Sequence, residues 1–340
     1  MGKFSQNTER YSGKKKPQAG VTAALVLLVV VLAAVLALNF VLFRVMPGDA
    51  VSTIIDPNFS PQAKERLREL YGLERPLLEQ FFLYLKQMLT FRFGLSFLSR
   101  KPVWDELLSR LPGTLILMSL SMLCSAALGV WLGVKAAVKR GSWLERTVLR
   151  VGAVMSSFPG FFVQLVLLML LAHDFPIFPL RGSLSVPAPS GAWALLADRA
   201  WHLALPVLSL TLMGFGGWAL YVRNLMVRAL GEDYVLMARA RGLTRRRVIY
   251  GHAFRTILPP LVTILLMSVP GLVSGAVITE TVFSLRGVGA FLLEALSGHD
   301  YPAAGASFYL LALITVVCNL LADVAYGLVD PRVRLEGMNR

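Results

Sequence analysis

The chain has 340 residues, of which 56% are apolar and only 16% are Asp, Glu, Lys or Arg, and its mean hydropathy is +0.63. These values lie outside the range of ordinary soluble domains and predict a protein that crosses a membrane several times. The formal net charge is +14, but no soluble basic domain accompanies it, which argues against nucleic-acid binding.

Six segments without Asp, Glu, Lys or Arg are long enough to cross a hydrocarbon core of about 30 Å, which takes roughly 20 helical residues. A charge at the bilayer centre costs about 2.5–3.5 kcal/mol, so its exclusion from six such runs indicates transmembrane helices. We therefore predict an all-α integral membrane protein with six transmembrane helices. The predicted spans are Val21–Phe43, Leu111–Val134, Val151–His173, Ala200–Val222, Thr256–Thr279 and Tyr301–Ala322.

The first span is expected to be a retained helix and not a cleaved signal peptide. It follows three lysines at 14–16, but its apolar stretch exceeds the roughly 7–15 residues of a signal-peptide core. No small-residue cleavage site follows Phe43. The sequence thus predicts an N-terminal tail at 1–20 and a first transmembrane helix at 21–43.

The distribution of Lys and Arg predicts the orientation. The tail 1–20, the connection between the second and third spans, and the loop 223–255 are rich in basic residues, whereas the third and fifth connections are balanced or acidic. Because basic residues favour the cytoplasmic side, the first three segments are expected there and the other two outside. Both termini, including the tail 331–340, are then cytoplasmic. The net charge follows from this topology and from contact with anionic membrane lipid.

The long first connection, 44–110, is expected to be a folded periplasmic loop region with short helices. Ser60 and Pro61 can start one helix that Gly72 ends, and Pro76 can start a second. The second helix is shorter than a span, so it would rest on the membrane surface or on the helix bundle. Its apolar face carries Leu77, Phe81, Leu85 and Met88. A packing role and a contact with a delivered substrate or its carrier both remain open.

Small residues and prolines inside the spans predict close helix approach and bends. Such features suit a moving bundle, but they also recur in membrane helices for packing alone, and both interpretations remain open. The residues concerned are Gly129 and Gly133, Gly271 and Gly275, Pro159, Pro206 and Pro270.

The loop 223–255 is more patterned than a simple connection. We predict a short helix from Glu232 to Ala240, Gly242 as the residue that ends it, and Thr244 as the N-cap of a second helix, Arg245–Ile257, that continues into the fifth span. Leu236, Ala240 and Leu243 would share one face, beside a row made by Ala238 and Gly242. From this pattern alone, a docking element for another protein and a merely basic cytoplasmic loop are equally consistent.

A resemblance to a known family decides between them. The segment is similar to the signature loop, the EAA region, of ABC importer permeases in the form used by dipeptide, oligopeptide and nickel importers. The residues that carry the likeness are Glu232-Asp233-Tyr234, Ala238-Arg239-Ala240-Arg241-Gly242-Leu243, Arg246-Arg247, His252-Ala253 and Leu258-Pro259-Pro260. The literal Glu-Ala-Ala is absent, as is usual in this subfamily.

The likeness extends over nearly the whole chain and matches the first, "B"-type, permease subunit. One departure is Ala50, where the family commonly has Pro. The further matching segments are Met46-Pro47-Gly48-Asp49, Tyr71-Gly72-Leu73-Glu74-Arg75-Pro76-Leu77, Phe93-Gly94-Leu95-Ser96, Arg110-Leu111-Pro112-Gly113-Thr114-Leu115, Gly141-Ser142-Trp143, Glu280-Thr281-Val282-Phe283 and Asp330-Pro331-Arg332-Val333-Arg334.

The resemblance implies the type I ABC importer permease fold, with 111–330 as a five-helix permease core in the bacterial cytoplasmic (inner) membrane. It implies that the loop 223–255 holds the coupling helix that docks on an ATPase subunit. The expected docking residues are Tyr234, Ala238, Ala240, Arg241, Gly242 and Leu243. The implied partners are a second, "C"-type permease subunit, two ABC ATPase subunits that bind ATP and Mg, and an extracytoplasmic substrate-binding protein.

The chain itself is expected to hold no cofactor and to be non-catalytic, since it lacks the Gly-x-x-x-x-Gly-Lys-Ser/Thr phosphate loop. Peptides, nickel chelates, glutathione and peptide-like antibiotics all pass through relatives of this fold, with peptides the most frequent. The sequence identifies no residue of the substrate pathway.

Two other function classes fit less well. A secondary transporter would place an ionisable residue near the bilayer midplane, but the spans carry none there. Asp323 lies near the cytoplasmic end of the sixth span, where an ion pair with a basic loop residue is favoured over a proton relay. An intramembrane enzyme would need a motif such as Gly-x-Ser-x-Gly or His-Glu-x-x-His, and neither occurs. The sequence therefore predicts neither a catalytic nor a metal site.

Overall fold

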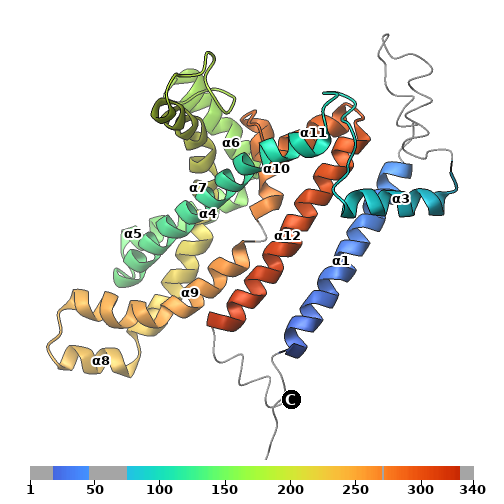
Figure 1. The fold of residues 1–340 in the computed structure, drawn as a ribbon. Helices are drawn as coiled ribbons and strands as arrows, with labels where there is room; N and C mark the ends of the chain where they lie inside the picture. Colours follow the sequence, from blue (N-terminus) through green and yellow to red (C-terminus); the bar gives the residue numbers. More distant parts are fainter. Residues whose placement is uncertain (1–17, 46–74, 270–271, 330–340) are drawn as a thin grey trace, which may run out of the picture.

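The computed structural model describes residues 18–45, 75–269 and 272–329. Within these ranges the secondary structure is helical and contains no β-strand beyond an isolated bridge between Leu95 and Pro102. This confirms the all-α fold class. The helices, labelled in Figure 1, are α1 (Gln18–Val45), α3 (Leu77–Leu89), α4 (Val103–Val138), α5 (Trp143–Ser157), α6 (Gly160–Leu168), the π-helix η1 (Met169–Asp174), α7 (Ala192–Leu230), α8 (Asp233–Ala240), the π-helix η2 (Arg247–Ala253), α9 (Phe254–Ser268), α10 (Leu272–Val282), α11 (Val288–Ser297) and α12 (Tyr301–Val329).

Each predicted span falls on helical structure. Among the described residues, four segments are long and apolar enough to cross a membrane: α4, α7, Arg247–Ser268 and Tyr301–Ala322. The pair formed by α5 and α6 with η1 would be a fifth, and the first predicted span lies within α1. The count of six spans and the side on which the termini lie stay predictions.

The third predicted span is interrupted at Pro159, one of the prolines expected to bend the spans, and the interruption is a complete break between two helices. The third breaks between α5 and α6 with a bend of 102°. Pro159 causes this break, because it lacks an N–H and forces Phe158 into an extended conformation, with φ −83° and ψ 145°. In the fifth, α9 ends at Ser268 and α10 begins at Leu272, and Pro270 and Gly271 lie outside the described residues. Pro206, by contrast, sits inside the continuous helix α7.

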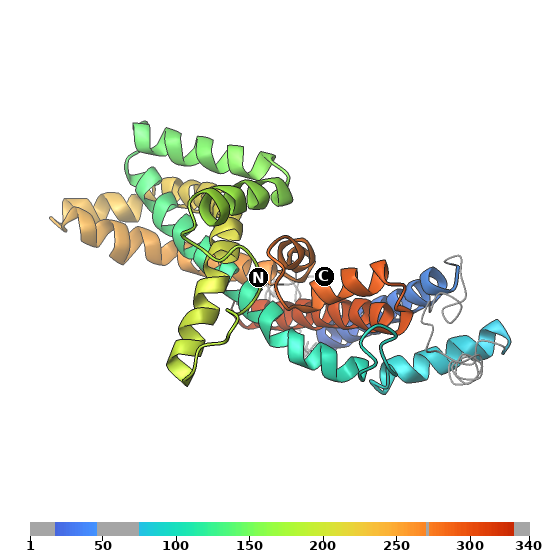
Figure 2. The ribbon, with the colours of Figure 1, turned by 90° about the horizontal axis from the view of Figure 1, so that it is seen from above.

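The centre of the molecule is the crossing of α4 with α7, and glycines allow it. A Cβ on Gly129 would lie 2.8 Å from the carbonyl oxygen of Phe215, and one on Gly133 would lie 2.7 Å from that of Ala219. Gly152 on α5 meets Gly216 on α7 in the same way, with 2.6 Å from an added Cβ to the opposing Cα. These glycines let the backbones approach closely. Figure 2 shows α4 and α7 crossing between two groups of helices.

One of these two groups consists of α1, α3, α11 and α12. The side-chain amide of Asn39 on α1 donates a 3.0 Å hydrogen bond to the carbonyl of Gly305 on α12. Helix α3 begins after Pro76, as predicted, and lies across the end of α1 (Figure 1). The predicted helix from Ser60 to Gly72 lies outside the described residues, as does the side chain of Asp323.

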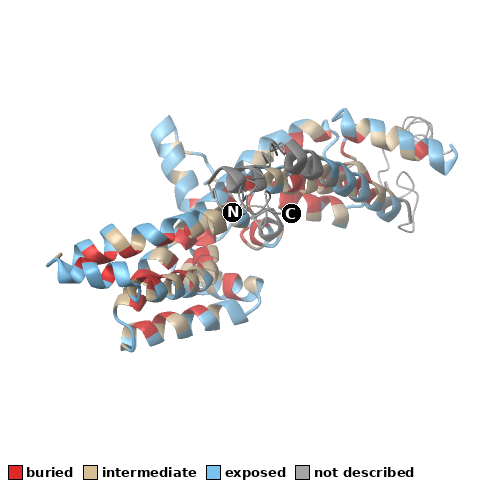
Figure 3. Ribbon diagram, turned by 90° about the horizontal axis from the view of Figure 1, so that it is seen from below, coloured by how far each residue is buried: buried red, intermediate tan, exposed pale blue. Residues whose placement is uncertain are grey.

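The arrangement places α8 at one end of the molecule and α3 and α11 at the other (Figure 1). The start of α1 and the end of α12 lie toward the same end as α8. Buried positions concentrate where helices face one another, while much of the outer helical surface is exposed (Figure 3). Large apolar side chains such as Trp131 and Leu165 lie on that outer surface, which suits contact with lipid.

Candidate functional site

Helix α8 stands between two long helices, α7 and the segment that leads into α9. It runs from Asp233 to Ala240, and Glu232 and Arg241 are its cap residues. Gly242 has a φ of +76°, and its N–H bonds to the carbonyl of Arg239 at 2.9 Å, while the N–H of Leu243 bonds to the carbonyl of Ala238 at 3.3 Å. These two bonds form a Schellman motif, which needs a residue that adopts positive φ. The predicted helix and its glycine end are therefore confirmed.

The inner face of α8 packs on the helix bundle. Val235 is only 1% exposed and Ala238 only 5%, and Leu243 is partly buried against the same cluster. Ala238 was expected on the docking surface, and this is a correction: it lies one turn from Val235 and faces the bundle. The other cluster members come from α4, α7, η2 and α9: Val134, Ala137, Val222, Met226, Ala229, Val248, Ile249, Ala253, Ile257 and Leu261.

The outer face of α8 exposes large apolar side chains. Leu236 is 67% exposed and Met237 is 58% exposed. The predicted residues Ala240, Arg241 and Gly242 are exposed along the same side of the helix. Met237 was not singled out from the sequence, although its spacing of three residues from Ala240 would have placed it there. An apolar surface of this kind, rimmed by arginine, is typical of an interaction site.

Tyr234, the remaining predicted residue, connects α8 to the returning helix. Its hydroxyl lies 3.1 Å from the hydroxyl of Thr256 on α9. The returning helix starts at Arg245, after Thr244, as predicted, but after Arg246 it continues as the π-helix η2. The structure thus brings Tyr234, Ala240, Arg241 and Gly242 to the surface. Their role in coupling remains a prediction.

Charged side chains tie this end of the bundle together. Glu145, near the start of α5, accepts a 2.7 Å hydrogen bond from Nε of Arg223 on α7, and Nη2 of the same arginine also contacts it. Arg245 donates from Nη2 to the carbonyl of Val138 at the end of α4, at 3.4 Å. In the sequence these charges indicate only topology, because a pair such as Glu145 and Arg223, 78 positions apart, leaves no local pattern.

A second polar site lies around Glu280, which the sequence analysis counted as a charge of an external loop. It is buried near the end of α10, and this corrects that assignment. The hydroxyl of Thr114 on α4 donates to its Oε1 at 2.6 Å, and the N–H of Ala290 on α11 donates to its Oε2 at 3.0 Å. Gly287 makes room for the carboxylate, since an added Cβ would lie 2.1 Å from the carboxyl carbon.

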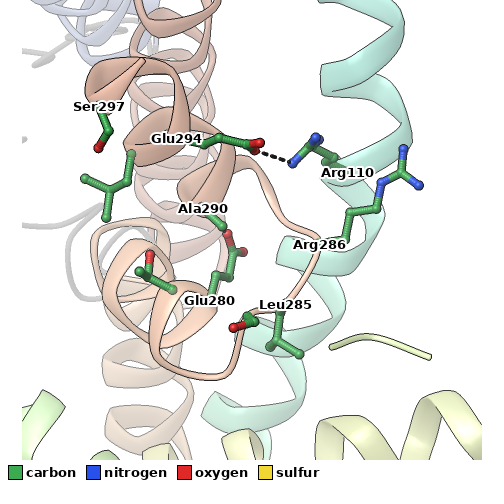
Figure 4. Close-up of a pocket in the computed structure, with 10 residues that line it drawn as sticks. Arg110, Glu280, Leu285, Arg286, Ala290, Glu294 and Ser297 are labelled. Carbon is green, nitrogen blue, oxygen red and sulfur yellow. Dashed lines mark hydrogen bonds and ion pairs between the residues drawn. The ribbon is translucent and has the colours of Figure 1, made fainter. Parts of the chain in front are cut away.

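A pocket of about 480 Å³ opens beside Glu280, between α4 and the α10–α11 turn (Figure 4). Arg110, Arg286 and Glu294 line it together with Glu280. Arg110 lies 3.5 Å from Glu294, which Figure 4 marks as a dashed line. Elsewhere among the described residues, no three His, Cys, Asp or Glu side chains gather as metal ligands would. The expectation that the chain binds no metal stays a prediction.

Comparison with known proteins agrees with this architecture. Residues 128–335 match the family described as binding-protein-dependent transport system inner membrane component, and residues 20–118 match the N-terminal part of such membrane components. The chain is 34% identical to the dipeptide transport system permease protein DppB of Escherichia coli K12, and 35% identical to the di/tripeptide transport system permease protein DppB of Pseudomonas aeruginosa UCBPP-PA14. It is 31% identical to the oligopeptide transport system permease protein AppB of Bacillus subtilis 168.

Each alignment covers 87% of this chain and 93% of the relative. The matches therefore extend over almost the full length of both proteins, and the family model over 128–335 includes α7 and α8. The fold is that of ABC type I permeases, as the resemblance implied, and the chain is a multi-pass inner-membrane protein. On these grounds the chain belongs to the family of binding-protein-dependent transport system inner membrane components, as a "B"-type permease.

Proposed function

We propose that this chain is the permease subunit of an ABC importer for short peptides and that α8 is its coupling helix. One observation supports the role of α8 as the coupling helix: it exposes Leu236 and Met237 to the outside while Val235 and Ala238 lie in the bundle core. A helix with one face held by the bundle and the other free suits a contact that transmits motion.

The packing beneath α8 supplies a route by which a movement of α8 would reach the long helices of the bundle. The cluster around Val235 and Ala238 includes the ends of α4 and α7, through Val134 and Met226, and the π-helix η2, through Val248. Protein interiors are close-packed, so a displacement of α8 is transmitted to neighbouring helices and is not absorbed. An ATPase that pulled α8 would thus move α4 and α7 against the rest of the bundle.

The other functions of the importer are assigned to partner subunits. We infer that two ATPase subunits bind ATP and Mg, that a second permease subunit completes the pathway, and that an extracytoplasmic binding protein delivers the substrate. The absence of a phosphate loop from the sequence supports the assignment of ATP hydrolysis to partners. This chain then contributes half of the translocation pathway and no catalytic group.

The substrate class is inferred from the relatives, whose names describe dipeptide, di/tripeptide and oligopeptide transport. Short peptides are common to all three. The proposal is therefore an importer of peptides of two to a few residues, with the choice among them left largely to the binding protein.

The test is reconstitution of the chain with its partner subunits in liposomes. Uptake of labelled dialanine is expected to require ATP, the ATPase subunits and the binding protein, and the isolated chain is expected to hydrolyse no ATP. Dialanine uptake by this chain alone, driven by an ion gradient, would instead indicate a secondary transporter.

A further inference from the structure

The pocket beside Glu280 has the size and lining of a binding site. Its volume of about 480 Å³ falls in the usual range for small-molecule sites, about 300–1,000 Å³. Side chains of both signs line it: Arg110 and Arg286, and Glu280 and Glu294. It belongs to the α10–α11 region, and α11 lies at the end of the molecule away from α8 (Figure 1).

Two of these four charged side chains, Glu280 and Arg110, are held in place by contacts within the protein. Glu280 accepts hydrogen bonds from Thr114 and from the backbone of Ala290, so it forms part of the pocket wall. Nε of Arg110 lies 3.2 Å from Oε2 of Glu106, and its guanidinium lies 4.3 Å from the centre of the Phe291 ring. These two contacts hold the Arg110 guanidinium in place at the edge of the pocket.

The other two charges are weakly engaged. The side chain of Arg286 is 62% exposed, and its ion pair with Glu106 is long, at 4.0 Å. Glu294 is 61% exposed, and its contact with Arg110 is 3.5 Å. Ion pairs that are long and have one exposed partner contribute little, so Arg286 and Glu294 can each change partner at small cost.

The two arginines also share a single carboxylate oxygen. Oε2 of Glu106 is the atom that both Arg110 and Arg286 approach, and Lys101 approaches the other oxygen of the same side chain at 4.0 Å. One carboxylate thus serves three cations. A second carboxylate placed between the two guanidinium groups would find donors not fully used.

We propose that this pocket binds a short peptide with free ends, its terminal carboxylate between Arg110 and Arg286 and its α-ammonium group on Glu294. Because Arg286 is positive and Glu294 is negative, a zwitterionic peptide can bind in one direction only. This inference rests on the proposed function, because it places a substrate site on the pathway of a peptide importer. The site is distinct from α8 and adds recognition by the permease itself.

The test measures binding of dialanine to the purified complex of this chain with its permease and ATPase partners, without the binding protein, by saturation-transfer NMR. Arg286→Gln and Glu294→Gln are each expected to weaken dialanine binding roughly tenfold, about 1.4 kcal/mol. Arg199→Gln removes an exposed arginine of α7 outside the pocket and is expected to change nothing. Equal co-purification of partner subunits with all variants shows that the complex is folded.

Modified peptides identify which end each residue binds. Dialanine amide lacks the carboxylate, so Arg286→Gln should bind it as well as the wild type does. N-acetyl-dialanine lacks the ammonium group, so Glu294→Gln should bind it as well as the wild type does. Arg286→Lys keeps the charge and should lose less affinity for dialanine than Arg286→Gln.

Uptake assays on the same preparations separate the two proposals. A wild-type complex that imports dialanine, with binding unaffected by Arg286→Gln, would overturn the site and leave the importer function intact. Weaker docking of the binding protein in the variants, with unchanged dialanine binding, would also overturn it and make the pocket a protein contact. A complex that binds dialanine through Arg286 and imports no peptide would contradict the importer function and support the site.

Discussion

Thr114 and Glu280 are joined by a buried hydrogen bond although they are 166 residues apart in the chain. Thr114 also accepts a 2.9 Å bond from the N–H of Val288, so its hydroxyl links α4 to both α10 and α11. The same helix α4 contributes Val134 and Ala137 to the cluster beneath α8. One continuous helix therefore connects the α10–α11 turn with the proposed coupling helix.

Replacing Thr114 with valine tests the strength of this link. The substitution keeps the shape but removes the donor to a buried carboxylate, and we expect a loss of about 1–3 kcal/mol in stability. Thermal unfolding of the purified complex measures it. Ser121→Ala is the matched control, because that buried hydroxyl donates to the carbonyl of Leu117 in its own helix and, among the described residues, links α4 to no other helix. An equal loss in both variants would contradict a special role for the Thr114–Glu280 bond.

Gly242 tests whether the backbone at the end of α8 matters for coupling. An added Cβ would meet nothing of this chain within 4 Å, so within the chain the effect of a substitution comes from the positive φ. Gly242→Val should strain the turn by about 1–2 kcal/mol and lower the peptide imported per ATP hydrolysed, whereas Gly242→Asn should be tolerated better. Uptake and ATPase activity are measured together. Wild-type coupling in Gly242→Val would count against α8 as the coupling helix.

The two faces of α8 should respond differently to truncation. Leu236→Ala removes an exposed apolar side chain and is expected to weaken association with the ATPase subunit by about 1–2 kcal/mol, with little change in thermal stability. Val235→Ala removes a buried one and should lower stability by about 1 kcal/mol. Co-purification yields and unfolding temperatures distinguish the two effects. Identical behaviour of both variants would show that the outer face is not a docking surface.

The pair formed by Glu145 and Arg223 should stabilise the packing of α5 on α7. Arg223→Gln leaves a mostly buried carboxylate with fewer donors, and we expect a loss of about 1–2 kcal/mol, reduced by the partial exposure of the arginine. Arg228→Gln, which changes an exposed arginine five residues further along α7, is the control. Combining Arg223→Gln with Glu145→Gln should restore part of the stability. No recovery in the double variant would argue against direct coupling of the two side chains.

The sequence by itself determined the features that depend on local chemistry. Runs without charges predicted helices at all six positions, Pro76 marked the start of α3, and Gly242 marked the end of α8. Each follows from neighbours in the chain: the cost of a charge in lipid, the missing N–H of proline, and the freedom of glycine at positive φ. Proline also predicted a bend near residue 159, though not its angle of 102°.

Tertiary structure alone decided which face of each helix is buried. Lipid and protein interior are both apolar, so a membrane helix carries little periodic signal for its inner face. Glu280 was counted as a loop charge and is buried against Thr114, a partner that no neighbouring residue announces. Ala238 was expected on the surface and lies in the core because α8 carries apolar residues on both faces, and only the packing of the helices decides which face is covered. Pairs such as Glu145 with Arg223 are likewise set by how α5 and α7 cross, because no local pattern links residues so far apart in the chain.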